Sequence, residues 1–411
     1  MRGMKVLVIS PTFPPMRSGG ADHAFRICQY LARRRVEIHV ITSRIDHIVT
    51  DPNMRVYPVM EDWSWTELPR LLRIARRYRP DVVNIHFSGA IYGDQPMITF
   101  APTLLKKALP NVRVVTLVEY PEPVYVHRSS WAARIGRKLA AYWVGPADVD
   151  YGYGTLLRDS DRIIVLSDAH VPLLAAHHAQ VREKCVLIPS PPLMRMSSEG
   201  DGAARLRGRE MLGLASDDFL VAYFGYLYPG KGIETLLEGF RLVANQRSNA
   251  RLVMIGDSNE VVLQRLNRPK YGQELRDMVK DLGIEGKVIW TGYYPVESDL
   301  ASIYLRAADT CVLPFDDGVM LNRSSFASAV AHGLPTVTTQ GESLEAPFRH
   351  NENVLLCKPR DPASLAAALD SLIIQPQLRH QLSCGALSMA REWFSWDGTV
   401  ERTLKAFGYT S

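Results

Sequence analysis

The most informative stretch of the chain is FLVAYFGYLYPGKG, residues 219–232. Its apolar run shows no alternation, which is typical of a parallel strand buried on both faces. A glycine turn at Gly225 follows, and Lys231 lies where a helix-period segment begins. A lysine at the positive end of a helix can bind phosphate, although a solvated surface lysine is the commoner case. The stretch therefore predicts a buried strand, a turn and a candidate anion site.

The same order of strand, turn and helix recurs along the whole chain. In the first half we predict strands at residues 5–10, 37–42, 82–86, 112–118, 162–166 and 185–188, and helices at 24–34 and 65–78. In the second half we predict strands at residues 219–225, 251–256, 288–291, 310–314 and 336–339, and helices at 232–245, 273–282, 300–306, 325–332 and 363–374. This alternation predicts an α/β fold with two Rossmann-like, doubly wound parallel-sheet domains that face each other across a central cleft.

The length of 411 residues suits two domains of ordinary size. We predict a first domain over residues 1–190 and a second over 191–390. The polar, irregular segment at residues 195–207 is expected to be an interdomain linker.

The composition is that of a soluble globular protein, with 46% hydrophobic and 22% charged residues. No secretory signal or membrane-spanning apolar stretch is recognisable, and the five scattered cysteines show no metal-ligand spacing. We expect a reduced, cytoplasmic protein without a metal and without nucleic-acid partners. The net charge of +5 suits anionic ligands or an anionic membrane surface and demonstrates neither.

Two further turns resemble the first in their chemistry. Gly19 and Gly20 follow the first predicted strand, so backbone N–H groups could approach an anion there. The turn lacks the GxGxxG pattern, which argues against a nicotinamide dehydrogenase, and a plain strand-to-helix turn is an equal alternative. The second turn precedes a predicted helix that Ser324 or Ser325 could cap, and it contains Asp317, Gly318, Asn322 and Arg323.

These residues, in this order, resemble the family-4 glycosyltransferases of the GT-B fold, and the resemblance covers nearly the whole chain. The matching motifs are the Gly19-Gly20 turn, PDVVNIH at 80–86, the strands at 161–167 and 186–189, Gly225 with Lys231-Gly232, the strands at 288–292 and 308–314, the segment at 329–335 and FSW at 394–396. In this family the FSW motif begins a helix that returns to the first domain. We place this closing helix at residues 391–411.

The resemblance implies a retaining transfer of a sugar from a nucleotide-diphosphate sugar to a hydroxyl acceptor, with no metal and no tightly bound cofactor. Cationic side chains and helix N-termini would stabilise the departing diphosphate. The acceptor would be a saccharide, a lipid-linked compound or a small molecule, in the biosynthesis of polysaccharides or glycoconjugates. Peripheral contact with an anionic membrane at its inner face is also compatible with the family.

Three departures from the family pattern stand out. Tyr226 lies where the family has a phosphate-binding arginine, and Glu119 follows Val118 where a histidine is common. Asp317 takes the place of the first glutamate of the donor motif, and Ser328 that of the second, ribose-binding one. We hypothesise that Arg323, in the lengthened loop, substitutes for the missing arginine.

On this basis we predict His86, Glu119, Lys231 and Asp317 as catalytic residues. His86 and Glu119 would orient the acceptor hydroxyl or the sugar, and a structural role for His86 is about as well supported. The predicted donor-binding residues are Gly19, Gly20, Gly225, Lys231, Tyr293, Tyr294, Gly318, Asn322, Arg323, Ser324, Ser325 and Ser328. Tyr293 and Tyr294 would line the nucleobase, although aromatic packing in the core is the more usual role.

Residues 128–143 form a predicted basic amphipathic helix. We favour an ordinary surface helix with its apolar stripe packed on the sheet over a membrane-docking helix. Two other functions stay open for the chain as a whole. One is a sugar-nucleotide epimerase, for which no convincing set of acid and base residues is found, and the other is a non-catalytic GT-B partner subunit with a decayed donor site.

Overall fold

The structure is a computed structural model that describes residues 3–49 and 51–409. It divides into two compact units: unit 1 comprises Met1–Pro189 and Trp396–Ser411, and unit 2 comprises Ser190–Ser395. The predicted domain ends at residues 1–2 and 410–411 lie outside the described residues.

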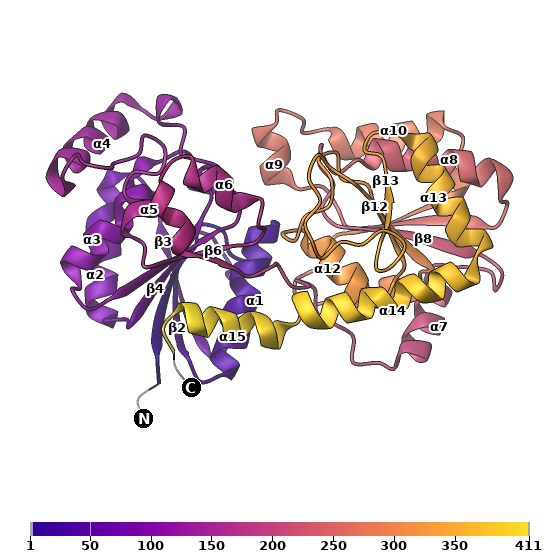
Figure 1. The fold of residues 1–411 in the computed structure, drawn as a ribbon, viewed down its shortest axis with the longest axis horizontal. Helices are drawn as coiled ribbons and strands as arrows, with labels where there is room; N and C mark the ends of the chain where they lie inside the picture. The colour runs from indigo at the N-terminus through magenta and orange to yellow at the C-terminus, as the bar shows by residue number, and fades with distance from the viewer. Residues whose placement is uncertain (1–2, 50, 410–411) are drawn as a thin grey trace. The chain divides into compact units, whose positions relative to one another are not determined.

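Unit 1 is built on a seven-stranded parallel sheet with helices on both faces (Figure 1). The strands, in spatial order, are β3 (Met54–Met60), β2 (Glu37–Ser43), β1 (Lys5–Ile9), β4 (Val82–Phe87), β5 (Arg113–Val118), β6 (Arg162–Val165) and β7 (Cys185–Leu187). The helices are α1 (Gly19–Arg33), α2 (Leu68–Tyr78), α3 (Ala101–Ala108), α4 (Trp131–Val144), α5 (Leu156–Asp159), α6 (His170–Ala175) and α15 (Trp396–Ala406). Every residue of β4 is buried, because central parallel strands are covered on both faces.

Unit 2 repeats this architecture with six parallel strands. They are, in spatial order, β10 (Val288–Gly292), β9 (Ala250–Ile255), β8 (Phe219–Phe224), β11 (Thr310–Leu313), β12 (Thr336–Thr339) and β13 (Leu355–Cys357). The helices are α7 (Asp201–Met211), α8 (Ile233–Gln246), α9 (Glu260–Arg265), α10 (Tyr271–Asp281), α11 (Leu300–Ala307), α12 (Ser324–Ala331), α13 (Pro362–Ile374) and α14 (Pro376–Trp393). Two Rossmann-like parallel-sheet units confirm the predicted fold class.

The strand order reverses once in each sheet, and this reversal locates the candidate sites. The chain runs outward from β1 to β3 and then returns to β4 on the other side of β1. Unit 2 does the same between β8 and β11. Ligands of such sheets bind at the carboxyl ends of the strands that flank the reversal. Most predicted site residues follow β1, β8 and β11, or lie at the ends of β4 and β5.

The predicted linker at residues 195–207 is wrong in its second part, because α7 begins at Asp201. Gly208 of α7 packs so closely on α11 that a Cβ there would lie 2.7 Å from the carbonyl oxygen of Ile303. Arg205 also donates to the Asp309 carboxylate at 2.6 Å. These tertiary contacts stabilise a helix in a segment whose polar composition predicted a loop.

The C-terminal segment contains two helices where we predicted one from residue 391. Helix α14 continues to Trp393, and Phe394 packs on Phe326 of unit 2 with ring centroids 6.1 Å apart. Helix α15 belongs to unit 1, where the Trp396 ring stacks on Tyr30 at 4.2 Å. The chain therefore passes from unit 2 to unit 1 just after the buried Phe394.

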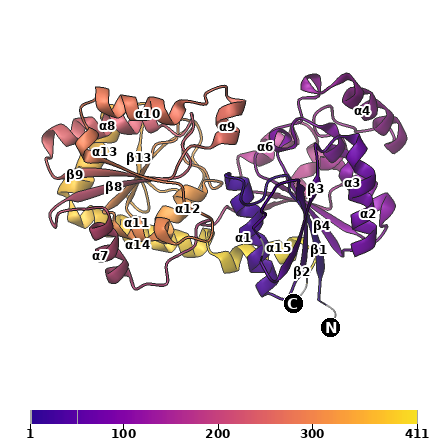
Figure 2. The same ribbon diagram turned by 180° about the vertical axis from the view of Figure 1, so that it is seen from behind.

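The prediction that the apolar stripe of residues 128–143 packs on the sheet is wrong. Helix α4 lies at the periphery of unit 1 in both views (Figures 1 and 2), and only Ala133 is fully buried among its residues. Trp131, Leu139 and Tyr142 are all exposed. Among the described residues, no helix is long and apolar enough to cross a membrane.

Candidate active site

In unit 1, the glycine turn after β1 receives a side chain of the protein itself. Ser18 caps α1, since its hydroxyl accepts from the Ala21 N–H at 3.1 Å. A Cβ at Gly20 would lie 2.5 Å from Oε2 of Glu119, whereas one at Gly19 would meet nothing within 4 Å. The Glu119 carboxylate therefore lies against the first turn of α1, where the helix dipole favours a negative charge. Gly20, and not Gly19, makes this approach sterically feasible.

His86 lies beside Glu119 on the neighbouring strand. The imidazole is fully buried, with Nε2 3.1 Å from Oδ1 of Asn84 and Nδ1 3.6 Å from Oε1 of Glu119. The Asn84 amide nitrogen donates to the Val115 carbonyl, so its Oδ1 is an acceptor and His86 Nε2 carries the proton. When His86 is neutral, its Nδ1 is therefore a hydrogen-bond acceptor, and it faces another acceptor, the Glu119 carboxylate.

Neither His86 Nδ1 nor Glu119 Oε1 has a hydrogen-bond partner among the described residues, and both atoms are buried. Buried polar atoms are rarely left in this state, so the pair requires an explanation. A hydroxyl group that approaches both atoms would donate to one of them. The structure thus brings the two predicted unit 1 residues together, and their contact with an acceptor hydroxyl stays a prediction.

Two neighbouring side chains keep His86 in place. The Tyr92 hydroxyl donates to the His86 carbonyl at 2.8 Å, and the His23 ring centroid lies 5.9 Å from that of His86. Burial, followed by the charge that His86 can carry, lowers the pKa of His23 to about 3. His23 is therefore neutral at neutral pH and adds no positive charge beside His86.

Sequence reasoning missed His23 and Thr12 as members of this region. The Thr12 hydroxyl, just after β1, is buried and has no hydrogen-bond partner among the described residues. The only available signal was position, because Thr12 lies in the turn that follows the first strand. Position alone does not distinguish a ligand-facing hydroxyl from a structural one.

In unit 2, two loops at the strand-order reversal are hydrogen-bonded to each other. The Asp316 N–H, after β11, donates to the Gly230 carbonyl, after β8, at 3.2 Å. Gly232 has a φ of 68°, and a Cβ there would collide with the carbonyl oxygen of Pro314. Only glycine fits this crossing point. The crossing places Lys231 beside the loop that follows β11.

Lys231 and Arg323 share one aromatic ring. The Lys231 Nζ lies 5.1 Å from the centroid of Phe315, and the Arg323 guanidinium carbon lies 4.7 Å from it. Both distances are within the range of cation–π contact. Phe315 is fully buried, so two cations from different loops are held at the carboxyl edge of the sheet by one rigid ring.

Tyr228 completes this group and was not predicted. The Lys231 Nζ lies 4.9 Å from its ring centroid. Burial acts to raise the pKa of the Tyr228 phenol, but the Lys231 charge, a hydrogen bond from Lys231 and the Arg323 charge outweigh burial and lower that pKa. The direction of this shift follows from the closeness of the two cations to the phenol, and the Asp317 charge acts against it.

Arg323 is not an unopposed cation. Its Nη2 donates to both oxygens of Asp317, at 2.6 and 2.7 Å. The guanidinium side chain is 14% exposed and the Asp317 side chain is 51% exposed. The two residues that we predicted separately, as a cation and as a catalytic carboxylate, form an ion pair in the structure.

Of the donor-binding residues predicted around the start of α12, some lie together and others differ from the prediction. Gly225 lies next to Ser325, since a Cβ on Gly225 would be 3.6 Å from that of Ser325. The predicted serine cap is wrong, because the N-cap residue is Arg323 and its side chain makes no capping hydrogen bond within the described part of the chain. Ser324 opens the helix, and Asn322 is half-buried just before it.

Ser328 has no support as a ligand contact. It is fully buried, and its hydroxyl donates to the Ser324 carbonyl one turn earlier at 2.8 Å. Gly318, with a φ of 90°, packs on backbone: a Cβ there would lie 2.3 Å from the Gly341 nitrogen. Gly318 therefore shapes the loop and needs no ligand to explain it.

Tyr293 and Tyr294 follow β10, which is the edge strand of the unit 2 sheet. Tyr294 lies with its ring 5.9 Å from that of Tyr304, and burial raises the pKa of its phenol to about 12. Both side chains are partly buried. The predicted contact with a nucleobase stays a prediction.

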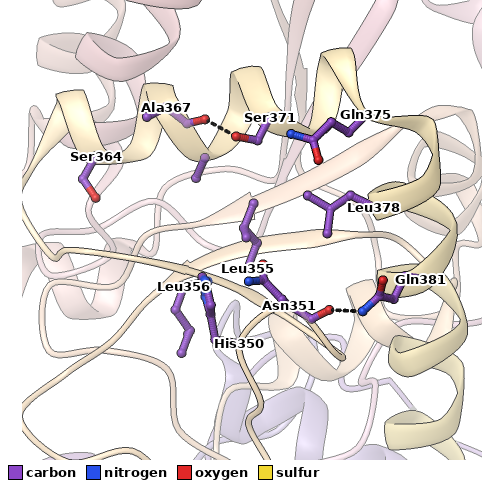
Figure 3. Close-up of a pocket in the computed structure, with 11 residues that line it drawn as sticks. His350, Asn351, Leu355, Leu356, Ser364, Ala367, Ser371, Gln375, Leu378 and Gln381 are labelled. Carbon is purple, nitrogen blue, oxygen red and sulfur yellow. Dashed lines mark hydrogen bonds between the residues drawn. The ribbon is translucent and has the colours of Figure 1, made fainter.

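A separate pocket of about 600 Å³ lies elsewhere in unit 2 (Figure 3). It is lined by His350, Asn351, Leu355, Leu356, Ser364, Ala367, Ala368, Ser371, Gln375, Leu378 and Gln381. The labelled polar groups are satisfied by the protein in part, since Gln381 donates to the Asn351 carbonyl and Ser371 to that of Ala367 (Figure 3). None of the predicted site residues lines this pocket.

Comparison with known proteins shows which family the chain belongs to. A model described as Glycosyltransferase Family 4 matches residues 17–191, and one described as Glycosyl transferases group 1 matches residues 207–388. The two matches together span nearly the whole chain. The chain belongs to the family-4-like glycosyltransferases.

Two curated relatives illustrate the family. The D-inositol 3-phosphate glycosyltransferase of Acidothermus cellulolyticus is 28% identical over 271 residues, which is 64% of this chain and 55% of the relative. The mannosylfructose-phosphate synthase of Agrobacterium fabrum is 28% identical over 257 residues, or 61% of this chain and 53% of the relative. The chain thus spans about half the length of the curated relatives that it matches.

Solved structures share the GT-B fold of this family-4-like glycosyltransferase. Anabaena HepE in complex with UDP and glucose has a TM-score of 0.69 at 16% identity, with 98% of this chain and 99% of that chain covered. The sucrose-phosphate synthase of Thermosynechococcus elongatus has a TM-score of 0.68 at 18% identity, with 98% of each chain covered. At these identities the likeness concerns the fold.

Proposed function

We propose that the protein transfers a sugar from a nucleotide-diphosphate sugar to a hydroxyl acceptor, with retention of configuration and without a metal ion. Membership of the family-4-like glycosyltransferases supports the reaction class. A relative in the same fold has been solved in complex with UDP-glucose, which supports this class of donor. The proposed setting is the biosynthesis of a polysaccharide or another glycoconjugate.

One observation supports the donor site above all others: Lys231 and Arg323 contact the same buried ring. When the sugar departs from its donor, negative charge develops on the nucleoside diphosphate. Fixed cations and the free N–H groups at the start of α12 would stabilise that charge without reorganising, in the place of a metal ion. Arg323 would exchange Asp317 for a phosphate oxygen when the donor binds.

The acceptor function is proposed for His86 and Glu119. Their two unpartnered atoms, 3.6 Å apart, would both contact the acceptor hydroxyl. This contact would orient the hydroxyl oxygen towards the sugar, and a phosphate oxygen of the donor would help to remove its proton. Glu119 would thus position the nucleophile, and Lys231 the leaving group.

The proposal is tested by nucleotide release from a panel of UDP-, GDP-, ADP- and dTDP-sugars, with Lys231→Ala as the key variant. Loss of one charge-assisted contact should weaken donor binding by about 1.5–3 kcal/mol, or roughly tenfold to 150-fold. Arg360→Ala is the matched control, because Arg360 also lies near this loop, 3.6 Å from Asp316, but is 74% exposed. It should leave donor binding unchanged.

The outcomes separate the competing functions. Release of free nucleotide that depends on Lys231 supports a transferase. Interconversion of the donor sugar without release would support an epimerase instead. Absence of binding by every nucleotide in the panel would assign the chain to a non-catalytic partner subunit.

A further inference from the structure

Helix α4 exposes its large apolar side chains. The exposed fractions are 70% for Trp131, 47% for Ile135, 65% for Leu139, 83% for Tyr142 and 66% for Trp143. Single exposed apolar residues are common on proteins, but five on one helix of 14 residues form a contiguous feature. We call these five residues the α4 apolar face.

The α4 apolar face is a narrow stripe. At the helical spacing of about 100° per residue, Trp131, Ile135, Leu139 and Tyr142 fall within an arc of about 80°, and Trp143 lies just beside it. Side chains so arranged can all enter one planar surface together. A helix that lies flat on such a surface needs this pattern.

The opposite side of α4 is made of small residues and attaches the helix to unit 1. A Cβ on Gly136 would lie 2.5 Å from the Trp65 ring, and the Trp65 indole N–H donates to the Ala133 carbonyl at 3.2 Å. An ordinary surface helix buries its large apolar residues and exposes its small or polar ones. In α4 this order is inverted, so packing within unit 1 does not account for the bulky stripe.

Positive charge flanks the stripe. Arg134 and Lys138 lie along one side of it and are exposed, and the structure records no ion pair for either among the described residues. Lys107 of α3 lies 4.2 Å from the Trp143 ring centroid, and Arg128 precedes the helix. Helix α4 contains no acidic residue, the Asp150 charge acts on its inward-turned Arg137, and Asp94 lies 3.9 Å from Arg128.

Arg137 shows which cations are available to a partner. It is turned back to unit 1, where it donates to the carbonyl groups of Asp150 and Tyr151 at 2.8 and 3.1 Å. Within the part of the chain that the structure describes, its neighbours Arg134 and Lys138 make no such contact. The cations beside the α4 apolar face are therefore the ones that face outward.

We propose that the α4 apolar face docks unit 1 on the interfacial region of an anionic lipid bilayer. Tryptophan and tyrosine prefer the lipid–water interface, because the ring is apolar and its polar atom stays hydrated. Arg134, Lys138 and Lys107 then meet the anionic headgroups. A second copy of the same face is the less favourable occupant, because it would bring these cations against their own copies.

This inference goes beyond the proposed function and does not depend on it. A transferase that acts on a soluble acceptor and one that acts on a lipid-linked acceptor would both use the donor site of unit 2 in the same way. Docking through α4 is a property of unit 1 alone. The two proposals can therefore fail separately.

The test is flotation of the full chain with vesicles of phosphatidylcholine, with and without phosphatidylglycerol. The protein should float only with the anionic vesicles, and added salt should release it. Arg134→Gln with Lys138→Gln should weaken binding roughly 25-fold, since each cation near an anionic surface contributes on the order of one kcal/mol. Arg76→Gln with Arg77→Gln, on exposed positions of α2, is the matched control.

Trp131→Ala with Tyr142→Ala should weaken vesicle binding by roughly tenfold or more. Leu206→Ala with Tyr409→Ala is the matched control, because these side chains are 73% and 49% exposed elsewhere. Since all these residues are exposed, the thermal midpoint should not change. Trp131 and Trp143 also provide a direct signal, a blue shift of their fluorescence on adding vesicles.

Three results would overturn the proposal. The first is a protein that stays unbound with anionic vesicles, and the second is equal binding to vesicles without phosphatidylglycerol. The third is a dimer that Trp131→Ala with Tyr142→Ala converts to a monomer, which would assign the α4 apolar face to a second copy. Nucleotide release with a water-soluble acceptor should be the same for all these variants, so a negative result leaves the proposed function standing.

Discussion

The two sheets present opposite chemistry at equivalent places. At the carboxyl ends of β1, β4 and β5, unit 1 places a buried imidazole beside a carboxylate, with Nδ1 of His86 3.6 Å from Oε1 of Glu119. After β8 and β11, unit 2 places Lys231 and Arg323 on one ring. One edge can accept a hydrogen bond from a hydroxyl group, and the other can hold an anion.

The same fold thus produces two different sites through the residues that follow its strands. The glycine turn of unit 1 faces the protein's own carboxylate, because Glu119 lies against Gly20. The glycine turn of unit 2 leads instead to a lysine that shares the Phe315 ring with Arg323. Similar turns in the sequence therefore do not imply similar surroundings in the structure.

The largest effect is expected from Glu119→Gln. The amide keeps the size of the side chain but removes the charge that would orient the acceptor hydroxyl. Misplacement of a nucleophile by about 1 Å can lower turnover on the order of 100-fold. We expect a loss of this size in kcat with donor affinity unchanged. A weaker donor affinity with normal kcat would break the assignment of unit 1 to the acceptor.

Acid should destabilise both units through buried histidines. The pKa is lowered from 6.5 to about 3 for His23 and to about 4 for His332, mainly by burial. Because the unfolded chain binds the proton more readily, stability is lost as the pH falls below 6.5. The loss reaches about 1.4 kcal/mol per pH unit for each histidine.

Urea unfolding measured between about pH 5.5 and pH 4.5 checks this expectation. His23→Gln should remove the contribution of His23 and make the slope shallower. His332 is kept neutral mainly by burial; its Nδ1 donates to the Ser328 carbonyl, and its Nε2 lies against the Ser302 hydroxyl, both at 2.7 Å. If His23→Gln leaves the dependence of the free energy of unfolding on pH unchanged, protonation of His23 does not destabilise the folded protein, which would contradict this expectation.

Gly20→Ala should separate stability from turnover. Alanine favours a helix over glycine by up to about 1 kcal/mol, so the free energy of unfolding should rise slightly. The new methyl group would displace the end of the Glu119 side chain, and turnover should fall roughly tenfold. Gly19→Ala is the control, because its Cβ would meet nothing within 4 Å. Equal turnover in both variants would contradict the role of the close approach.

The smallest effect concerns the ion pair of unit 2. Asp317→Asn should release Arg323 and remove a negative charge, so that the affinity for a nucleoside diphosphate rises roughly two- to fivefold. The predicted catalytic role of Asp317 would appear separately, as a lower kcat. A lower affinity would instead show that Asp317 holds Arg323 in its binding position, and calorimetry would measure it.

Much of the fold could be predicted because its central strands are buried on both faces. The stretch at 219–225 and the strand at 336–339 were predicted almost to the residue. The edge strand β3 was missed, since its middle residues are only half-buried and Pro58 interrupts it. Edge strands lack the continuous apolar run that reveals a buried strand.

The surroundings of the site could be predicted less well. The sequence suggested Lys231, Arg323 and Asp317 through their places after strands. It did not suggest that Asp317 pairs with Arg323 or that both cations contact Phe315. The Asp317 pair depends on how the loop after β11 folds back on itself, and the contact of Lys231 with Phe315 joins loops that are far apart in the chain. Helix α4 shows the same limit, because its periodicity marked an apolar stripe and gave no sign that the small side, at Ala133 and Gly136, would be the buried one.

The most direct test of this division between the units is calorimetric titration of the nucleoside diphosphate from the preferred donor into three proteins. These are the unmodified chain, Lys231→Ala and Glu119→Gln. We predict that Lys231→Ala raises the dissociation constant roughly tenfold or more, whereas Glu119→Gln leaves it unchanged. Unchanged binding by Lys231→Ala, or equal weakening by both variants, would contradict the account.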